Sequence, residues 1–293
     1  MENNLKRLAI GTAQFGMSYG IANKNGQVKF NEAEKILNLA IKKGISTIDT
    51  AKVYGDSEKE LGKLNISQFD VITKLPEIPK RLENVEKWLN HNFEDSLSNL
   101  EVEKIDGLLF HNTNDLLSSN GQEIYEKLLK FKESERIKKI GISIYSPEIL
   151  EHITSKYDFD IVQAPFNIID QRLLKSGWLK KLKDSGTEVH IRSIFLQGLL
   201  LMSLKDVPDK FNNWNHLFHS WSSWLKNNNI SALETCLSFS MSFPEIDKVI
   251  IGVDSFKQFL MIIDSLKNYT QTDFPLFECD DDNLLNPSNW KDL

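Results

Sequence analysis

The chain has 293 residues, of which 41% are hydrophobic and 26% are charged. These values are ordinary for a folded globular protein, and the length suits one barrel-sized domain better than two large ones. The formal net charge of −6 argues against nucleic acid as a partner, because neutralising many backbone phosphates requires a basic surface.

The cysteines and the apolar runs exclude further classes of protein. Cys236 and Cys279 form neither a metal-ligand cluster nor a disulfide framework, so we expect two reduced thiols and no metal site. Residues 1–8 lack the apolar core of a signal peptide, and no apolar run is long enough to span a bilayer. We therefore expect a cytoplasmic protein without a membrane partner.

Short apolar runs alternate with longer segments of helical periodicity. In the first unit, Asn31 is predicted to cap a helix with Glu34 as its capping-box partner, and Gly44 to stop that helix. The predicted strands are Leu8–Ala13, Ser46–Ala51, Asp70–Leu75, Ile105–His111, Lys139–Ile144, Ile161–Phe166, Glu188–Ile194 and Lys248–Val253. The predicted helices are Asn31–Gly44, Ser57–Leu64, Leu82–Leu100, Gly121–Glu133, Pro147–Ser155, Leu173–Ser185, Trp214–Asn227, Ser231–Ser242 and Ser255–Lys267.

This alternation of strands and helices favours parallel pairing, and eight such units can close into a barrel. We predict the α/β class with a single (β/α)8 TIM-barrel domain over residues 1–293, in which residues 270–293 form a C-terminal tail. A doubly wound open sheet is the alternative, but the sequence shows no early G-x-G-x-x-G turn for a dinucleotide.

Four ionisable residues fall at or just after the ends of the second, third and fourth predicted strands: Asp49, Tyr54, Lys74 and His111. The active site of such a barrel lies at the carboxyl ends of its strands, so these side chains can converge. Their chemistry suits carbonyl reduction, because Tyr54 can donate a proton, Lys74 can lower the pKa of that phenol and Asp49 can orient Lys74. His111 can hydrogen-bond the substrate oxygen.

The segment around the first two of these residues resembles the aldo-keto reductase superfamily. Its signature is matched by the stretches Gly44–Ala51, Val53-Tyr54-Gly55 and Ser57–Gly62, and Lys74 and His111 stand where the family has its lysine and histidine. The resemblance covers nearly the whole chain. It implies a catalytic tetrad, a nicotinamide cofactor (NADP or NAD) bound over the barrel mouth, and reversible reduction of a small-molecule carbonyl compound.

The resemblance also implies contacts with the cofactor and the substrate. Cofactor contacts are implied at Gly11, Thr12, Asp49, Ser143, Gln163, Arg192, Ser193, Phe195, Gly252, Asp254, Lys257 and Gln258. Substrate contacts are implied at Tyr54, His111 and Asn167. Two positions depart from the family's pattern. Ile144 stands where asparagine is frequent, and Arg192 where an aromatic ring commonly stacks on the nicotinamide. A guanidinium can stack on a ring or bind an anion.

Asp254 stands near the place where many members of the family have a cation for the 2′-phosphate of NADP. A carboxylate there would repel that phosphate and could accept a hydrogen bond from the free 2′-hydroxyl of NAD. In the alternative interpretation, Asp254 only caps the helix that follows and Lys257 holds the phosphate. The sequence leaves both open.

The substrate is predicted to be an aldehyde, a ketone or a keto-sugar. The short loops resemble those of bacterial sugar-processing relatives, which favours a keto-sugar or a nucleotide-linked sugar. Two other functions are weighed: a cofactor-binding regulatory subunit, like the relatives that attach to ion channels, and a Schiff-base aldolase that uses Lys74.

The sequence of the tail gives weaker indications. The acidic run Asp280–Asp282 is expected to be solvated rather than to bind a metal. Trp290 is expected either to cover the site or to pack on the outer helices, and the aromatic stripe over residues 214–225 is expected to be buried core.

Overall fold

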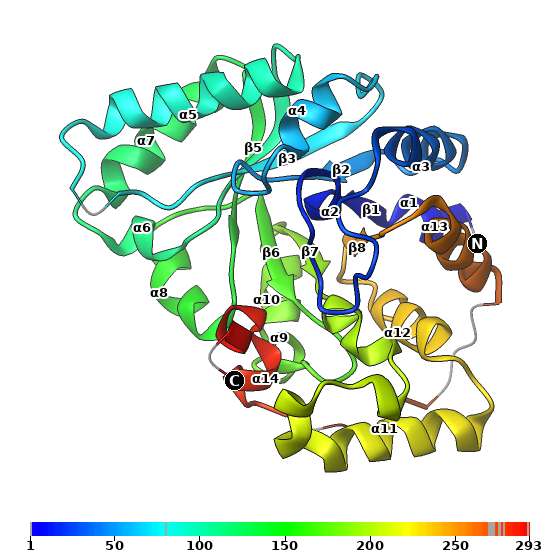
Figure 1. The fold of residues 1–293 in the computed structure, drawn as a ribbon. Helices are drawn as coiled ribbons and strands as arrows, with labels where there is room; N and C mark the ends of the chain where they lie inside the picture. The colour runs from blue at the N-terminus through cyan, green and yellow to red at the C-terminus, as the bar shows by residue number, and fades with distance from the viewer. Residues whose placement is uncertain (1, 80, 269–272, 275–276, 278, 292) are drawn as a thin grey trace.

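The computed structural model describes the whole chain apart from residues 1, 80, 269–272, 275–276, 278 and 292. Eight parallel strands close into a barrel in the order of the sequence, with β8 paired to β1 (Figure 1). The strands are β1 (Leu8–Gly11), β2 (Thr47–Asp49), β3 (Asp70–Leu75), β4 (Ile105–Phe110), β5 (Ile137–Ser143), β6 (Ile161–Pro165), β7 (Glu188–Arg192) and β8 (Lys248–Gly252). The predicted (β/α)8 barrel is confirmed.

Helices surround the barrel on the outside (Figure 1). They are α1 (Glu2–Lys6), α2 (Ala13–Gly16), α3 (Phe30–Lys42), α4 (Ser57–Gly62), α5 (Val85–Leu100), α6 (Asn114–Leu117), α7 (Gly121–Glu133), α8 (Leu150–Thr154), α9 (Arg172–Lys175), α10 (Trp178–Asp184), α11 (Asn215–Asn228), α12 (Ala232–Met241), α13 (Phe256–Ser265) and α14 (Asp282–Leu285). Short 3₁₀ turns are η1 (Pro147–Ile149), η2 (Leu196–Leu201), η3 (Leu204–Asp206), η4 (Asp209–Trp214), η5 (Leu266–Asn268) and η6 (Pro287–Lys291). In the part of the chain that the structure describes, no helix is long and apolar enough to cross a membrane.

Two helical predictions need correction. The capping box at Asn31 and Glu34 is wrong, because α3 begins one residue earlier, after an extended Lys29, and has no side-chain cap. The segment predicted as one helix over residues 173–185 forms α9 and α10 instead. Gly177 separates them because it adopts a left-handed backbone conformation with φ of 77°, which ends the first helix.

The interior of the barrel is packed. Ile72, Leu109 and Ile161 form an apolar cluster that is separate from the main core between strands and helices. Gly107 makes room for it, since a Cβ atom there would lie 2.7 Å from Ile72 Cδ1 and 3.1 Å from Ile161 Cδ1. This apolar floor closes the barrel below the ends of the strands, so a ligand can bind only above it.

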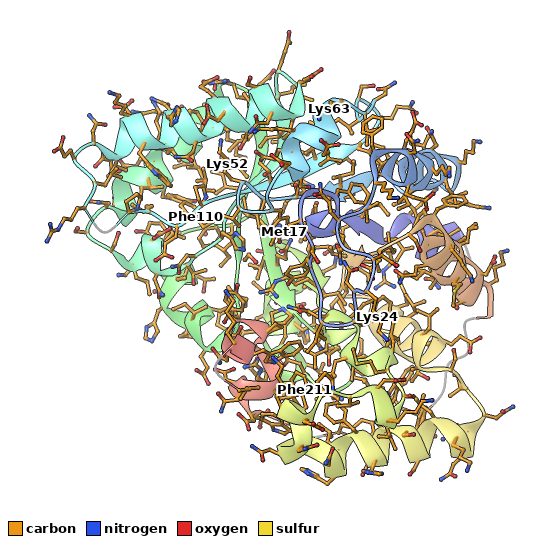
Figure 2. The ribbon with its side chains drawn as sticks, viewed as in Figure 1. Met17, Lys24, Lys52, Lys63, Phe110 and Phe211 are labelled. Carbon is orange, nitrogen blue, oxygen red and sulfur yellow. The ribbon has the colours of Figure 1, made fainter. Side chains whose placement is uncertain are left out.

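The described part of the C-terminal tail packs against the outside of the barrel near its mouth. Trp290 is buried, and its ring meets Phe211 of η4 edge to face at 4.9 Å. Figure 2 labels Phe211 below the C-terminal segment. The Trp214 indole donates a hydrogen bond to Asp281 at 3.1 Å. Of the two positions expected for Trp290, the structure shows packing on the outer elements. Asp280, Asp281 and Asp282 are all exposed, as expected for a solvated acidic run, although Asp281 also accepts this hydrogen bond.

Candidate active site

The two-residue period of the strands explains why polar residues gather above the apolar floor. Side chains two residues apart share a face of a strand, so Lys74 points into the barrel above Ile72. The other strands repeat this arrangement, because inward positions at or near their carboxyl ends are occupied by Asp49, Ser143, Gln163 and Arg192. A polar layer therefore covers the floor at the carboxyl ends of the strands.

A buried network joins three of these side chains. Lys74 Nζ donates to Asp49 Oδ1 at 2.7 Å and to the Thr50 carbonyl at 2.8 Å. The other carboxylate oxygen of Asp49 accepts a hydrogen bond from Gln163 Nε2 at 2.7 Å. The side chains of Lys74 and Asp49 are only 0% and 5% exposed. These bonds hold the Lys74 amino group in one position inside the barrel.

Tyr54 reaches the network from the loop after β2. Gly16 packs directly against this loop, since a Cβ there would lie 1.8 Å from the Tyr54 carbonyl oxygen. Lys74 Nζ lies 5.1 Å from the centroid of the Tyr54 ring. The ring of His111, immediately after β4, meets the Tyr54 ring edge to face at 5.9 Å. The structure thus brings Asp49, Tyr54, Lys74 and His111 together at one place.

The electrostatics of Tyr54 differ from the prediction. Burial raises the pKa of Tyr54 above its ordinary value, and the Asp49 carboxylate raises it further, while Arg192 opposes both. Burial also lowers the pKa of Lys74, against the favourable field of Asp49. The expected lowering of the pKa of Tyr54 by Lys74 is therefore not what this structure shows. Tyr54 is a phenol that keeps its proton.

His111 is neutral at physiological pH. Burial lowers its pKa to about 3, and the positive charges of Lys74 and Arg192 contribute. A neutral imidazole carries one N–H donor and one acceptor. His111 can therefore donate a hydrogen bond to a substrate oxygen without transferring its own proton.

Arg192 faces the same space from the opposite side of the barrel. Its Nη2 donates to the Ile144 carbonyl at 2.9 Å, and its Nη1 donates to Ser193 Oγ at 3.3 Å. The guanidinium carbon lies 4.8 Å from the centroid of the Tyr145 ring. Among the described residues, Arg192 has no carboxylate within ion-pair distance. Its charge is therefore free to act on the site.

Several predicted contact residues are occupied by bonds within the protein. Ser143 Oγ donates to Gln163 Oε1 at 3.3 Å, so that amide is fixed from both sides. Thr12 Oγ1 donates to the Asp49 carbonyl at 3.0 Å. Asn167 donates to the Ser193 carbonyl at 3.1 Å, and its own oxygen accepts from two backbone amides of the following turn. These bonds hold strand ends and loops in place.

The segment after β8 resolves one question about Asp254. Ser255, not Asp254, caps α13, because Ser255 Oγ accepts a hydrogen bond from the Gln258 amide. The capping interpretation of Asp254 is wrong. Its carboxylate instead accepts a weak bond from Gln258 Nε2 at 3.4 Å, and burial raises the pKa of Asp254. Lys257 is exposed, and Gly252 is an exposed glycine at the end of β8.

The remaining predicted positions also lie around the mouth. Gly11 ends β1 beside Gly252, its register partner on β8. Ser193 has a left-handed backbone with φ of 61° and leads into the buried Phe195. Gly11 and Gly252 thus lie side by side on neighbouring strands, and Ser193 and Phe195 follow the end of β7.

A cavity of about 420 Å³ opens beside His111, between the segments that follow β4 and β5. It is lined by His111, Asn112, Thr113, Asn114, Ser143, Tyr145, Ser146, Glu148, Ile149 and His152. Sequence reasoning missed most of these residues, because a loop residue without a strand position has no periodic signal. Tyr145 offered one indication, as an aromatic residue two positions after the inward-facing Ser143.

Comparisons with known proteins identify the family of this chain. The model of the aldo/keto reductase family matches residues 7–278, so the chain belongs to this family and is an oxidoreductase. It is similar to the uncharacterized oxidoreductase YqkF of Bacillus subtilis, with 22% identity over 275 residues that cover 87% of this chain and 89% of the relative.

Two solved structures share the fold. One is the aldo-keto reductase AKR11C1 of Bacillus halodurans in its holo form, with a TM-score of 0.72, 19% identity, and coverage of 91% of this chain and 88% of that one. The other is PA4992 of Pseudomonas aeruginosa, with a TM-score of 0.66, 19% identity, and coverage of 90% and 91%.

Proposed function

We propose that the protein reduces the carbonyl group of a polyhydroxylated, sugar-like substrate with NADPH or NADH. The observation that carries the proposal is the position of the tetrad. Asp49, Tyr54, Lys74 and His111 lie between the cavity at β4 and β5 and the ends of β8 and β1, where Gly252 is exposed. In a barrel of eight strands these two regions face each other across the mouth.

The residues at β8 and β1 fit a nucleotide cofactor. Exposed Gly252 allows close approach of a ligand to the backbone, and α13 presents its capped N-terminus beside it. Ser143 and Gln163 are candidates for the carboxamide, and Arg192 for stacking on the ring. When bound, the nicotinamide supplies the hydride.

The chain's own residues handle the proton. Tyr54, whose pKa is raised, donates its proton to the carbonyl oxygen as that oxygen gains negative charge. Neutral His111 donates a hydrogen bond to the same oxygen and fixes its position. Lys74 Nζ lies 5.1 Å from the centroid of the Tyr54 ring and fixes its surroundings, while the charge of Arg192 favours the phenolate left behind. Asp49 and Gln163 keep Lys74 in place.

The lining of the cavity favours a substrate with many hydroxyl groups. Asn112, Asn114, Thr113 and Ser146 offer both donors and acceptors, and Glu148 offers an acceptor for a pair of hydroxyls. None of the described residues that line the cavity is a lysine or an arginine. A neutral sugar matches this set of groups better than an apolar aldehyde does.

The test is a steady-state assay with both cofactors against a panel of sugars, keto-sugars and short aldehydes, together with Tyr54→Phe. We expect turnover that favours hydroxylated substrates and is lost in the variant. Tight cofactor binding without turnover of any carbonyl compound would instead support a regulatory subunit. Preference for apolar aldehydes would contradict the substrate class.

A further inference from the structure

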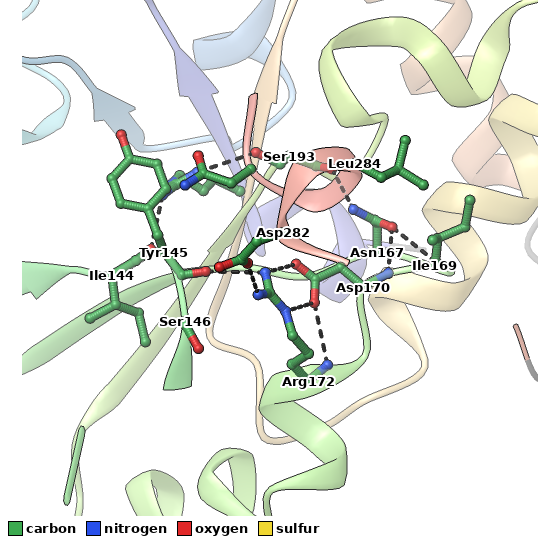
Figure 3. Close-up of polar contacts among 12 residues, drawn as sticks. Ile144, Tyr145, Ser146, Asn167, Ile169, Asp170, Arg172, Ser193, Asp282 and Leu284 are labelled. Carbon is green, nitrogen blue, oxygen red and sulfur yellow. Dashed lines mark hydrogen bonds and ion pairs between the residues drawn. The ribbon is translucent and has the colours of Figure 1, made fainter. Parts of the chain in front are cut away.

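An ionic network ties the C-terminal segment to the edge of the cavity (Figure 3). Its centre is Arg172, the first residue of α9. The guanidinium holds buried Asp170 with two hydrogen bonds, from Nε and Nη2, both at 2.8 Å. It also donates from Nη1 to Asp282 of α14 at 2.5 Å. Segments 110 positions apart in sequence therefore meet at one side chain.

The same guanidinium reaches the substrate side of the barrel. Arg172 Nη2 also donates to the Tyr145 carbonyl oxygen at 3.2 Å. Tyr145 lines the cavity, and its ring carries the guanidinium of Arg192 at 4.8 Å. Arg172 thus fixes the backbone of a residue whose side chain contacts both the cavity and a charged group of the active site.

The C-terminal segment is anchored on its other side as well. Trp214 Nε1 donates to Asp281 at 3.1 Å, and Lys210 Nζ donates to the Trp290 carbonyl at 2.5 Å. These bonds hold the C-terminal segment in place, and Asp282 of this segment in turn holds Arg172. The side chain of Arg172 is 12% exposed, whereas that of Asp282 is 63% exposed. Removal of the Asp282 carboxylate leaves Arg172 paired with Asp170, so that no buried charge loses all of its partners.

We infer that Arg172 is a positioning residue and that Asp282 makes the C-terminal segment a determinant of substrate affinity. Arg172 sets the position of Tyr145, and Tyr145 forms the wall of the cavity on which a long hydroxylated substrate rests. A short aldehyde that reaches only the tetrad does not use this wall. The substrate class in this inference rests on the proposed function. The positioning of Tyr145 rests only on the contacts described above.

The test compares Asp282→Asn with Asp280→Asn. The control removes the same charge from the same acidic run, but Asp280 is exposed and is not part of the network. For the hydroxylated substrate, Asp282→Asn should raise KM by up to about fivefold, the upper limit expected for loss of an ion pair with one exposed partner, with little change in kcat. KM for propanal and the Kd of the cofactor should stay unchanged. Arg172→Lys, which keeps the charge but loses the forked geometry, should raise KM further.

Hydrogen exchange supplies a readout that needs no turnover. Asp282→Asn should speed amide exchange over residues 145–149, and Asp280→Asn should not. The inference is overturned if both variants behave alike, or if Asp282→Asn changes neither KM nor exchange. If wild-type protein reduces no carbonyl compound, the proposed function fails, and exchange alone still decides whether Asp282 positions Tyr145.

Discussion

Two ion pairs near the barrel mouth have the same chemistry and different surroundings. Lys74 and Asp49 lie inside the barrel at 2.7 Å, with side chains 0% and 5% exposed. Arg172 and Asp282 lie at its edge at 2.5 Å, with side chains 12% and 63% exposed. A charge left alone inside the barrel has no water to compensate it, whereas Asp282 remains solvated. We therefore expect the buried pair to be required for the stability of the fold, and the exposed pair to affect mainly the affinity for substrate.

The largest effect is expected from breaking the inner pair. Lys74→Met leaves Asp49 with Gln163 but without a cation, so the free energy of unfolding should fall by about 3–5 kcal/mol. Asp282→Asn should lower it by about 1 kcal/mol or less. Denaturant unfolding of both variants measures this contrast. Equal losses in the two variants would refute the role assigned to burial. Activity of Lys74→Met should also be lost.

The next largest effect concerns Tyr54, the proposed acid beside the pair of Lys74 and Asp49. Tyr54→Phe keeps the ring and removes the proton donor, so kcat should fall by about 10²–10⁴-fold. The Kd of the cofactor should stay within a few-fold of wild type. Tyr125→Phe, which loses a hydroxyl bonded to the Asp158 carbonyl on the outer surface, is the matched control. A kcat for Tyr54→Phe close to that of the control would exclude Tyr54 as the acid.

Asp254 extends the comparison to a carboxylate without a cation partner among the described residues. We expect wild-type protein to use NADH appreciably, because this carboxylate opposes a 2′-phosphate. Asp254→Arg should shift the ratio of kcat/KM values toward NADPH by about tenfold, since a charged hydrogen bond to phosphate is worth roughly 1.5–3 kcal/mol. Asp264→Arg, farther along α13, is the control. Strict use of NADPH by wild type, unaltered by Asp254→Arg, would show that Asp254 points away from the cofactor.

The smallest effect concerns His111, which lies near the cations Lys74 and Arg192. Its pKa falls from an ordinary 6.5 to about 3 through burial and the charges of Lys74 and Arg192. The unfolded chain therefore binds a proton near pH 6.5 that the folded protein refuses until about pH 3. This contribution to stability is present above pH 6.5 and declines as the pH falls below it. The free energy of unfolding should decline less between pH 7 and pH 5 in His111→Asn than in wild type. An equal decline would mean that His111 titrates normally.

The sequence predicted the barrel and the convergence of the tetrad because both depend on strand periodicity. Asp49 and Lys74 lie on β2 and β3, where residue spacing fixes the face to which a side chain points. The roles of Tyr145, Arg172 and Asp282 could not be predicted, because they depend on where loops and the C-terminal segment meet. The pKa of Tyr54 was predicted in the wrong direction because its burial cannot be derived from spacing.

The apolar floor has a consequence for the geometry above it. Ile72 and Lys74 are two residues apart on the inner face of β3, and Ile72 fits over Gly107 only because that residue has no side chain. A methyl group at position 107 would act as a wedge, displacing Ile72 or tilting β3, and β3 carries Lys74. The packing beneath Lys74 therefore depends on a glycine at the base of the barrel. Changes deep in the barrel can retune catalysis while every residue of the mouth stays the same.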